Sequence, residues 1–320
     1  MSSPPQWYLA MSDLCVLAAS LLVQGKTPGW KLDVPPRPIW SALFQPRSDV
    51  DRACESAAVS DVPAPIRRPE FSRSVQAVAA SSLSQTLPRP TTEAQRYVQR
   101  LAALQAGKLY TSLPTDSFQA LWSRATRQPD RADWVKLLHY EAKAVADGQG
   151  PAKLSVLLGD SLAEQFPVEQ LSRDRFWLNQ GIAGDSTADI LQRLDSFDKT
   201  RPDAIYITAG ISDLRKGASN DDVLSNIQEM IRRLRVSHPG AQIYIHAILP
   251  TRLEAISVNR IRRLNYNISL LAEQEGARFV NLQPAFADPE GRLQAQLTTD
   301  GLHLNRRGYQ VWQKTLWPLS

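Results

Sequence analysis

Cysteine is scarce in this chain, and its scarcity argues against two classes of protein. Cys15 and Cys54 are the two cysteines among 320 residues, and they show no ligand spacing of a zinc site. Two cysteines are also too few for the disulfide framework of a small secreted domain. The composition therefore favours a reducing compartment, and we expect a cytoplasmic location.

A long apolar run is also missing. The apolar stretch from Leu14 to Val23 is far shorter than the roughly 20 residues that span a bilayer. It has the length of the apolar region of a signal peptide, but Asp13 stands where a basic residue should precede it. We expect a short helix that packs or lies on a membrane surface, with export as the alternative and Met11 as a second possible start.

Positive charge is not concentrated in one basic run. The net charge is +5, and residues 151–320 carry nearly equal numbers of acidic and basic side chains. The excess lies in the first 150 residues in short groups such as Arg67-Arg68. No such group is interleaved with aromatic residues, as a nucleic-acid surface would need. We therefore expect no nucleic-acid partner.

Composition divides the chain into four parts. Residues 1–25 hold the apolar N-terminal segment, and residues 26–90 are rich in Pro, Ser, Ala and Arg without apolar periodicity. We expect a disordered linker at 26–90, because such a segment buries too little apolar surface to offset its ordering entropy. Residues 91–150 repeat apolar residues at helical spacing and predict two or three helices. Residues 151–320 form the last part.

Residues 151–320 alternate short apolar runs with longer amphipathic ones. This pattern predicts a three-layer α/β domain, in which helices cover both faces of a five-stranded parallel sheet. Ligands bind such sheets at the carboxyl ends of the strands, so chemistry is expected in the segments that follow them. The predicted strands are 154–158, 176–179, 204–208, 242–248 and 278–282.

Two of these segments carry catalytic residue types. Gly159-Asp160-Ser161-Leu162 follows the first strand and places Ser161 at a helix start, where N–H groups and the helix dipole favour a developing negative charge. Taken alone, Ser161 is better explained as a helix N-cap. Asp300-Gly301-Leu302-His303 follows the fifth strand and puts a carboxylate three residues before an imidazole. Such a carboxylate can orient a histidine that takes a proton from serine.

Two further segments complete a family pattern. Asn179-Gln180-Gly181-Ile182-Ala183-Gly184 follows the second strand, and Gly210-Ile211-Ser212-Asp213 follows the third. With the two segments above, they resemble in order the four blocks of the SGNH (GDSL) hydrolases. The resemblance covers about residues 153–316. The longer phrases at 178–181 and 299–304 also resemble bacterial members, such as those of a cyanobacterial subgroup with an N-terminal extension.

The resemblance implies a flavodoxin-like strand arrangement and ester hydrolysis through an acyl-enzyme, without metal or cofactor. By this matching Ser161 is the nucleophile, His303 its base and Asp300 the residue that orients His303. The N–H groups of Ser161 and Gly184 line the oxyanion hole. Ser212 stands where the family has an asparagine whose amide is the third donor; a hydroxyl is shorter, but it can donate directly or through a water. We expect a slow esterase for short-chain acyl or acetyl esters, including those of carbohydrates or lipids.

Four other polar residues near these segments have expected roles. Asp160 and Asp185 are expected as helix-start caps. Asp213 is expected either to support the oxyanion hole or to cap a loop. His246, near the end of the fourth strand, is expected as a core imidazole, because no carboxylate stands near it in sequence.

Two other functions stay open. Because Ser212 replaces the asparagine, the domain could bind acylated or glycan ligands without turning them over. The same catalytic residues could also transfer an acyl group to or from a carbohydrate. The expected partner is a small-molecule ester, and the sequence predicts neither its acyl chain, nor its alcohol, nor the oligomeric state.

Overall fold

The computed structural model describes residues 87–316. The helix predicted within residues 1–25 and the linker predicted at 26–90, apart from its last four residues, lie outside the described residues. All described residues belong to one unit of the chain.

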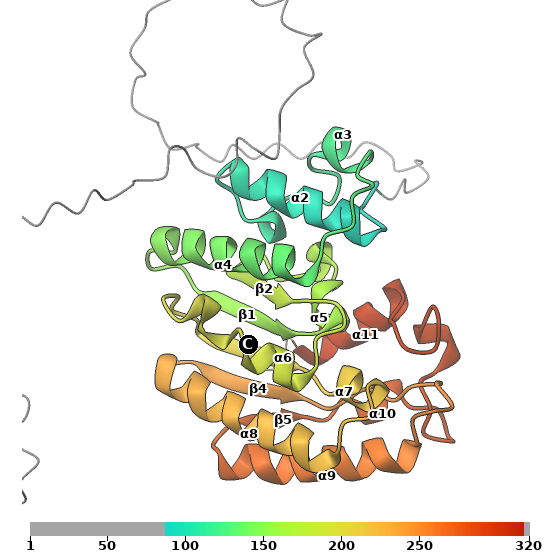
Figure 1. Cartoon of the computed structure of the whole chain (residues 1–320). Coiled ribbons are helices and arrows are strands. Elements are labelled where there is room, and N and C mark those ends of the chain that lie inside the picture. The colour runs from blue at the N-terminus through green and yellow to red at the C-terminus, as the bar shows by residue number, and fades with distance from the viewer. Residues whose placement is uncertain (1–86, 317–320) are drawn as a thin grey trace, which may run out of the picture. The chain divides into compact units, whose positions relative to one another are not determined.

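Five strands form a parallel sheet in the order β2-β1-β3-β4-β5 (Figure 1). The predicted five-stranded parallel sheet is thus confirmed, and its order is that of the flavodoxin-like folds. The strands are β1 (Leu154–Gly159), β2 (Phe176–Gly181), β3 (Ala204–Thr208), β4 (Gln242–His246) and β5 (Arg278–Val280). The helices are α2 (Glu93–Gln105), α3 (Gln119–Trp122), α4 (Arg131–Gly148), α5 (Ser161–Glu164), α6 (Thr187–Leu191), α7 (Ile211–Arg215), α8 (Asn220–Ser237), α9 (Val258–Gln274), α10 (Gln283–Phe286) and α11 (Arg306–Leu316).

Helices cover both faces of the sheet. On one face, strand residues such as Leu158 pack with apolar side chains of α4, α8 and α9. On the other face, Leu157 packs with α10 and α11. Neighbouring residues of a strand point to opposite faces, so a strand that is covered on both faces is buried throughout, as β1 is. The segments that carry the predicted site follow the carboxyl ends of β1, β2 and β3.

Helix α5 is shorter than its predicted range. The sequence predicts a helix from Ser161 to about Gln170, but α5 ends at Glu164 and a separate 3₁₀ turn follows. The prediction was wrong because Pro167 has no N–H to donate and disfavours helical conformation in the residue before it. A short helix and a 3₁₀ turn likewise replace the single helix predicted over 187–197.

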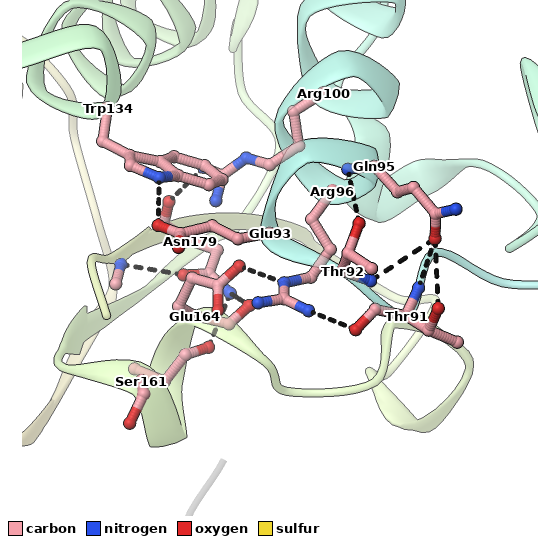
Figure 2. Close-up of polar contacts among 12 residues, drawn as sticks. Thr91, Thr92, Glu93, Gln95, Arg96, Arg100, Trp134, Ser161, Glu164 and Asn179 are labelled. Atoms are coloured by element: carbon pink, nitrogen blue, oxygen red, sulfur yellow. Dashed lines mark hydrogen bonds and ion pairs between the residues drawn. The ribbon is translucent and has the colours of Figure 1, made fainter. Parts of the chain in front are cut away.

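Helix α2 is fastened to the sheet by one buried arginine. Arg100 is 2% exposed, and its Nε and Nη2 donate to the Glu141 carboxylate at 3.1 and 2.6 Å. Nη2 also donates to the carbonyl of Asn179 at 2.8 Å (Figure 2). Because Glu141 belongs to α4 and Asn179 to β2, this one guanidinium joins three elements.

Removing the Arg100 charge should destabilise the fold. Arg100→Met leaves the carboxylate of Glu141 buried without a counter-charge, and we expect the free energy of unfolding to fall by about 3–5 kcal/mol. The double variant Arg100→Met/Glu141→Leu should regain much of this loss, because an apolar pair of similar volume often replaces a buried ion pair without cost. Urea unfolding followed by circular dichroism compares the chains, and an equal loss in both variants would contradict this account.

Candidate active site

Ser161 is the first residue of a one-turn helix. Helix α5 begins two residues after β1 ends, and its N-cap Asp160 accepts a hydrogen bond from the N–H of Leu162 at 3.0 Å. Ser161 is 8% exposed, so its environment is largely shielded from water. The hydroxyl therefore lies at a helix start that favours negative charge.

His303 lies in a loop that is folded onto itself. Thr298 and Leu304 form an antiparallel bridge across the loop. Inside it, Oδ1 of Asp300 accepts hydrogen bonds from the N–H groups of Leu302 and His303 at 3.0 and 2.7 Å. These contacts fix the backbone of His303 and thereby limit the directions its ring can take.

Serine, histidine and aspartate form one hydrogen-bonded line. His303 Nε2 lies 3.2 Å from Ser161 Oγ, and His303 Nδ1 lies 2.6 Å from Asp300 Oδ2. Partial burial raises the pKa of Asp300, but hydrogen bonds from the ring and the N–H of His303 outweigh burial and lower that pKa below its usual value. Asp300 is therefore ionised and can hold the tautomer whose Nε2 accepts a proton from serine. The structure brings together the three residues that the sequence singles out.

Gly184 and Ser212 lie on the loops that follow β2 and β3. Gly184 has φ +80°, a left-handed conformation that favours glycine. Its N–H donates to no backbone carbonyl within residues 87–316. Ser212 is 4% exposed, and its hydroxyl has no hydrogen-bond partner in the described part of the chain. Neither residue bonds to Ser161, so the oxyanion-hole role of both stays a prediction.

Asp213 joins the loops of Gly184 and Ser212. Its carboxylate accepts hydrogen bonds from the N–H and the hydroxyl of Thr187 at 2.8 and 2.6 Å. Thr187 begins α6, three residues after Gly184, and Asp213 follows Ser212 directly. Of the two roles expected for Asp213, the structure favours the supporting one.

Asp185 does not cap a helix, so that expectation was wrong. The N-cap of α6 is Ser186, and Asp185 instead pairs with Arg131 at 2.8 Å and with Arg193 at 2.7 Å. Arg193, which the sequence did not single out, also donates to the carbonyls of Gln180 and Gly159 at 2.8 and 3.0 Å. Because Gly159 precedes the Asp160-Ser161 turn, Arg193 holds that turn against the loop that carries Gly184.

Helix α5 is held from outside along its whole length. Asn179 Nδ2 donates to the carbonyl of Ala163 at 2.7 Å, and the hydroxyl of Tyr309 donates to that of Leu162 at 3.1 Å. Arg96 Nε donates to Glu164 at 2.6 Å (Figure 2). The β2 backbone also approaches closely, since a Cβ at position 181 would lie 2.2 Å from the N of Glu164. Only glycine fits there.

Asp160 is a fully buried acid beside Ser161. Its Oδ1 accepts the hydrogen bond from the N–H of Leu162, and its Oδ2 has no hydrogen-bond partner in the described part of the chain. Burial raises the pKa of Asp160 to about 7; the Leu162 N–H opposes this, and the nearby carboxylates of Asp213 and Asp185 add to it. Asp160 therefore gains its charge near neutral pH.

This shift makes the stability of the fold depend on pH. The folded pKa of Asp160 lies above its unfolded value, so the folded state holds the proton more tightly and stability falls as pH rises from about 4 to 7. Asp160→Asn stays neutral and keeps an acceptor for Leu162. The unfolding free energy of the wild type relative to this variant should fall by on the order of 2–3 kcal/mol between about pH 5 and 8. Urea unfolding of both proteins at both pH values measures this difference. If the difference between wild type and variant does not change with pH, the account is refuted.

His246 is a core residue, as predicted. It is 1% exposed, and its Nδ1 lies 2.9 Å from the hydroxyl of Thr208. Burial lowers the pKa of His246 to about 3, so its ring is neutral. Within residues 87–316, no group of three or more His, Cys, Asp or Glu side chains is placed to hold a metal ion. The helices of this same part include none with the length and apolar character needed to cross a membrane.

Comparisons with known proteins agree on one family. The model of the GDSL-like Lipase/Acylhydrolase family matches residues 142–311, which is more than half of the chain. The platelet-activating factor acetylhydrolase IB subunit alpha1 of Bos taurus is 28% identical over 184 residues, which cover 55% of this chain and 77% of that protein.

Solved structures share the fold. A protein of Streptococcus pneumonia described as a platelet activating factor is 25% identical, has a TM-score of 0.54 and covers 59% of this chain and 93% of its own. A GDSL-like lipase from Bacteroides thetaiotaomicron, 21% identical with a TM-score of 0.53, covers 58% of this chain and 96% of its own. The chain belongs to the GDSL-like lipase/acylhydrolase family and is a hydrolase that acts on ester bonds.

Proposed function

We propose that this protein is a serine esterase that removes acetyl and other short acyl groups from carbohydrate or lipid alcohols through an acyl-enzyme. The observation that carries the proposal is the hydrogen-bonded line from Asp300 through His303 to Ser161. An imidazole in contact with the hydroxyl, with a carboxylate behind it, is the arrangement that makes serine a nucleophile near neutral pH.

The reaction follows from these contacts. Nε2 of His303 takes the proton of Ser161 as Oγ attacks the ester carbonyl carbon, and the same proton passes to the alcohol oxygen as the C–O bond breaks. The acyl group stays on Ser161. His303 then takes a proton from water, whose oxygen attacks the acyl carbon, and returns it to Ser161 as the acid leaves. Asp300 stabilises the charged imidazole in both halves.

The oxyanion would be held by the N–H groups of Ser161 and Gly184 and the hydroxyl of Ser212. Within residues 87–316, the N–H of Gly184 donates to no backbone carbonyl and the hydroxyl of Ser212 has no hydrogen-bond partner. Both groups are therefore left for the oxyanion, which supports this assignment. Asp213 fixes the two loops from which they come. Donors held in place before the reaction stabilise the developing charge without reorganisation.

Two features support a short acyl group. The side chains of Asp300 and His303 are 52% and 28% exposed, so no apolar lid covers them in the described part of the chain. The bovine relative is named an acetylhydrolase. A small acyl group needs no deep apolar pocket beside the serine.

A fluorophosphonate probe tests the nucleophile. The wild type should be labelled within minutes and Ser161→Ala should not be labelled at all, because only an activated serine attacks the probe quickly. Ser123→Ala, at an exposed serine of the N-terminal helical part, is the matched control and should label like the wild type. Mass spectrometry of the labelled chain reads the result. Labelling of the native chain no faster than of the unfolded chain would instead indicate a non-catalytic binding module.

Restoring the family asparagine tests the oxyanion hole. Ser212→Asn should raise kcat on 4-nitrophenyl acetate by roughly tenfold, because loss of one oxyanion donor costs about 10² to 10³ in turnover and a hydroxyl recovers part of it. Ser212→Ala, which removes the donor, should lower kcat. If Ser212→Asn leaves kcat unchanged or lower while Ser161→Ala abolishes it, Ser212 does not face the oxyanion.

A further inference from the structure

A cavity of about 360 Å³ lies between the N-terminal helical part and the family domain. Arg96 and Arg100 of α2 line one side, while Glu164 of α5 and Arg306 of α11 line the other. Its volume is that of a pocket for a small molecule, for which the usual range is about 300–1,000 Å³. The cavity is therefore large enough to hold a ligand.

This cavity is not the catalytic site. Ser161, Asp300 and His303 do not line it, although Thr299, next to Asp300, does. The α2 wall lies outside residues 142–311, the part matched by the family model. The cavity is thus formed jointly by the family domain and the helices that precede it in this chain.

Positive charge predominates in its lining. Four arginines face two glutamates there. Arg89 pairs only loosely with Glu169, at 3.7 Å, and Arg306 forms no ion pair within the described residues. An anion in the cavity would therefore meet cations that the protein leaves incompletely neutralised.

Arg100 belongs to the buried wall of the cavity and is held by the protein itself. Its Nε and Nη2 donate to Glu141 and to the carbonyl of Asn179, and its Nη1 is buried without a partner in the described part of the chain. The arginines that an anion can reach are therefore the exposed ones, Arg89 and Arg306.

We propose that this cavity binds a small ligand through an anionic oxygen group, a phosphate or a carboxylate. The planar guanidinium presents paired N–H donors that match the oxygens of such groups. Arg306 and Arg89 would meet the ligand at the rim.

A bound anion should also affect the ester chemistry, and this consequence rests on the proposed function. Glu164 ends the helix that Ser161 begins, and it is held by Arg96 (Figure 2). An anion that draws Arg96 away weakens a contact that positions this helix. Binding and turnover should then be coupled.

Inorganic phosphate, titrated at constant ionic strength into the full chain carrying Ser161→Ala, tests the site by calorimetry. The expected result is saturable binding, which Arg306→Gln weakens about tenfold by removing one charge-assisted contact. Arg307→Gln is the matched control, because Arg307 is the next residue of α11, is also exposed and does not line the cavity. It should leave the Kd unchanged.

Absence of saturable binding would overturn the proposal, as would equal weakening by Arg306→Gln and Arg307→Gln. A second arm measures the effect of phosphate on hydrolysis of 4-nitrophenyl acetate. A raised KM that disappears in Arg306→Gln means that bound phosphate competes with the ester for overlapping space, as the anionic group of a substrate would. A change in kcat that disappears there means that a free anion acts through the position of α5, and both results support the site. Binding without any hydrolysis would refute the esterase and leave the anion site in place.

Discussion

The position of Ser161 depends on contacts made to a helix too short to be stable by itself. A helix of one turn satisfies few of its own backbone groups, and isolated helices need many more residues before they form in water. In α5 two carbonyls are bonded from β2 and α11, through Asn179 and Tyr309, and Arg96 of α2 holds the side chain at the end of the helix. The geometry between Ser161 and His303 is therefore a property of the assembled domain, and it exists only when these distant segments are in place.

Three buried carboxylates surround this helix, and their partners decide their charge. Asp185 has two arginines, and Asp213 has two hydrogen bonds from Thr187. Asp160 has a single N–H bond and one oxygen without a partner in the described part of the chain, and burial raises its pKa to about 7. A negative charge on Asp160 would oppose the oxyanion formed next to it.

Local sequence patterns predicted the sheet and the three aligned side chains. Short apolar runs marked the strands, and the resemblance to the four family blocks paired Ser161 with His303 across 142 residues. The role of Asp185 could not be predicted, because it depends on Arg131, which is 54 residues away and on a different helix. The early end of α5 was signalled by Pro167, but the amphipathic pattern continued past it. Long-range contacts of single polar residues leave no periodic trace in a sequence.

The boundary of the family match is not a folding boundary in this chain. The family match begins at residue 142, whereas α2, which supplies Arg96 and Arg100, begins at Glu93 (Figure 1). A domain that began at residue 142 would keep Ser161, Asp300 and His303. It would lose the guanidinium groups that pair with the buried Glu164 and with the carbonyl of Asn179. Leaving a buried charge or carbonyl without a partner is costly. Glu164 is the last residue of α5, and Asn179 is hydrogen-bonded to this helix. The helices from residue 93 to 148 therefore belong to the unit that positions Ser161.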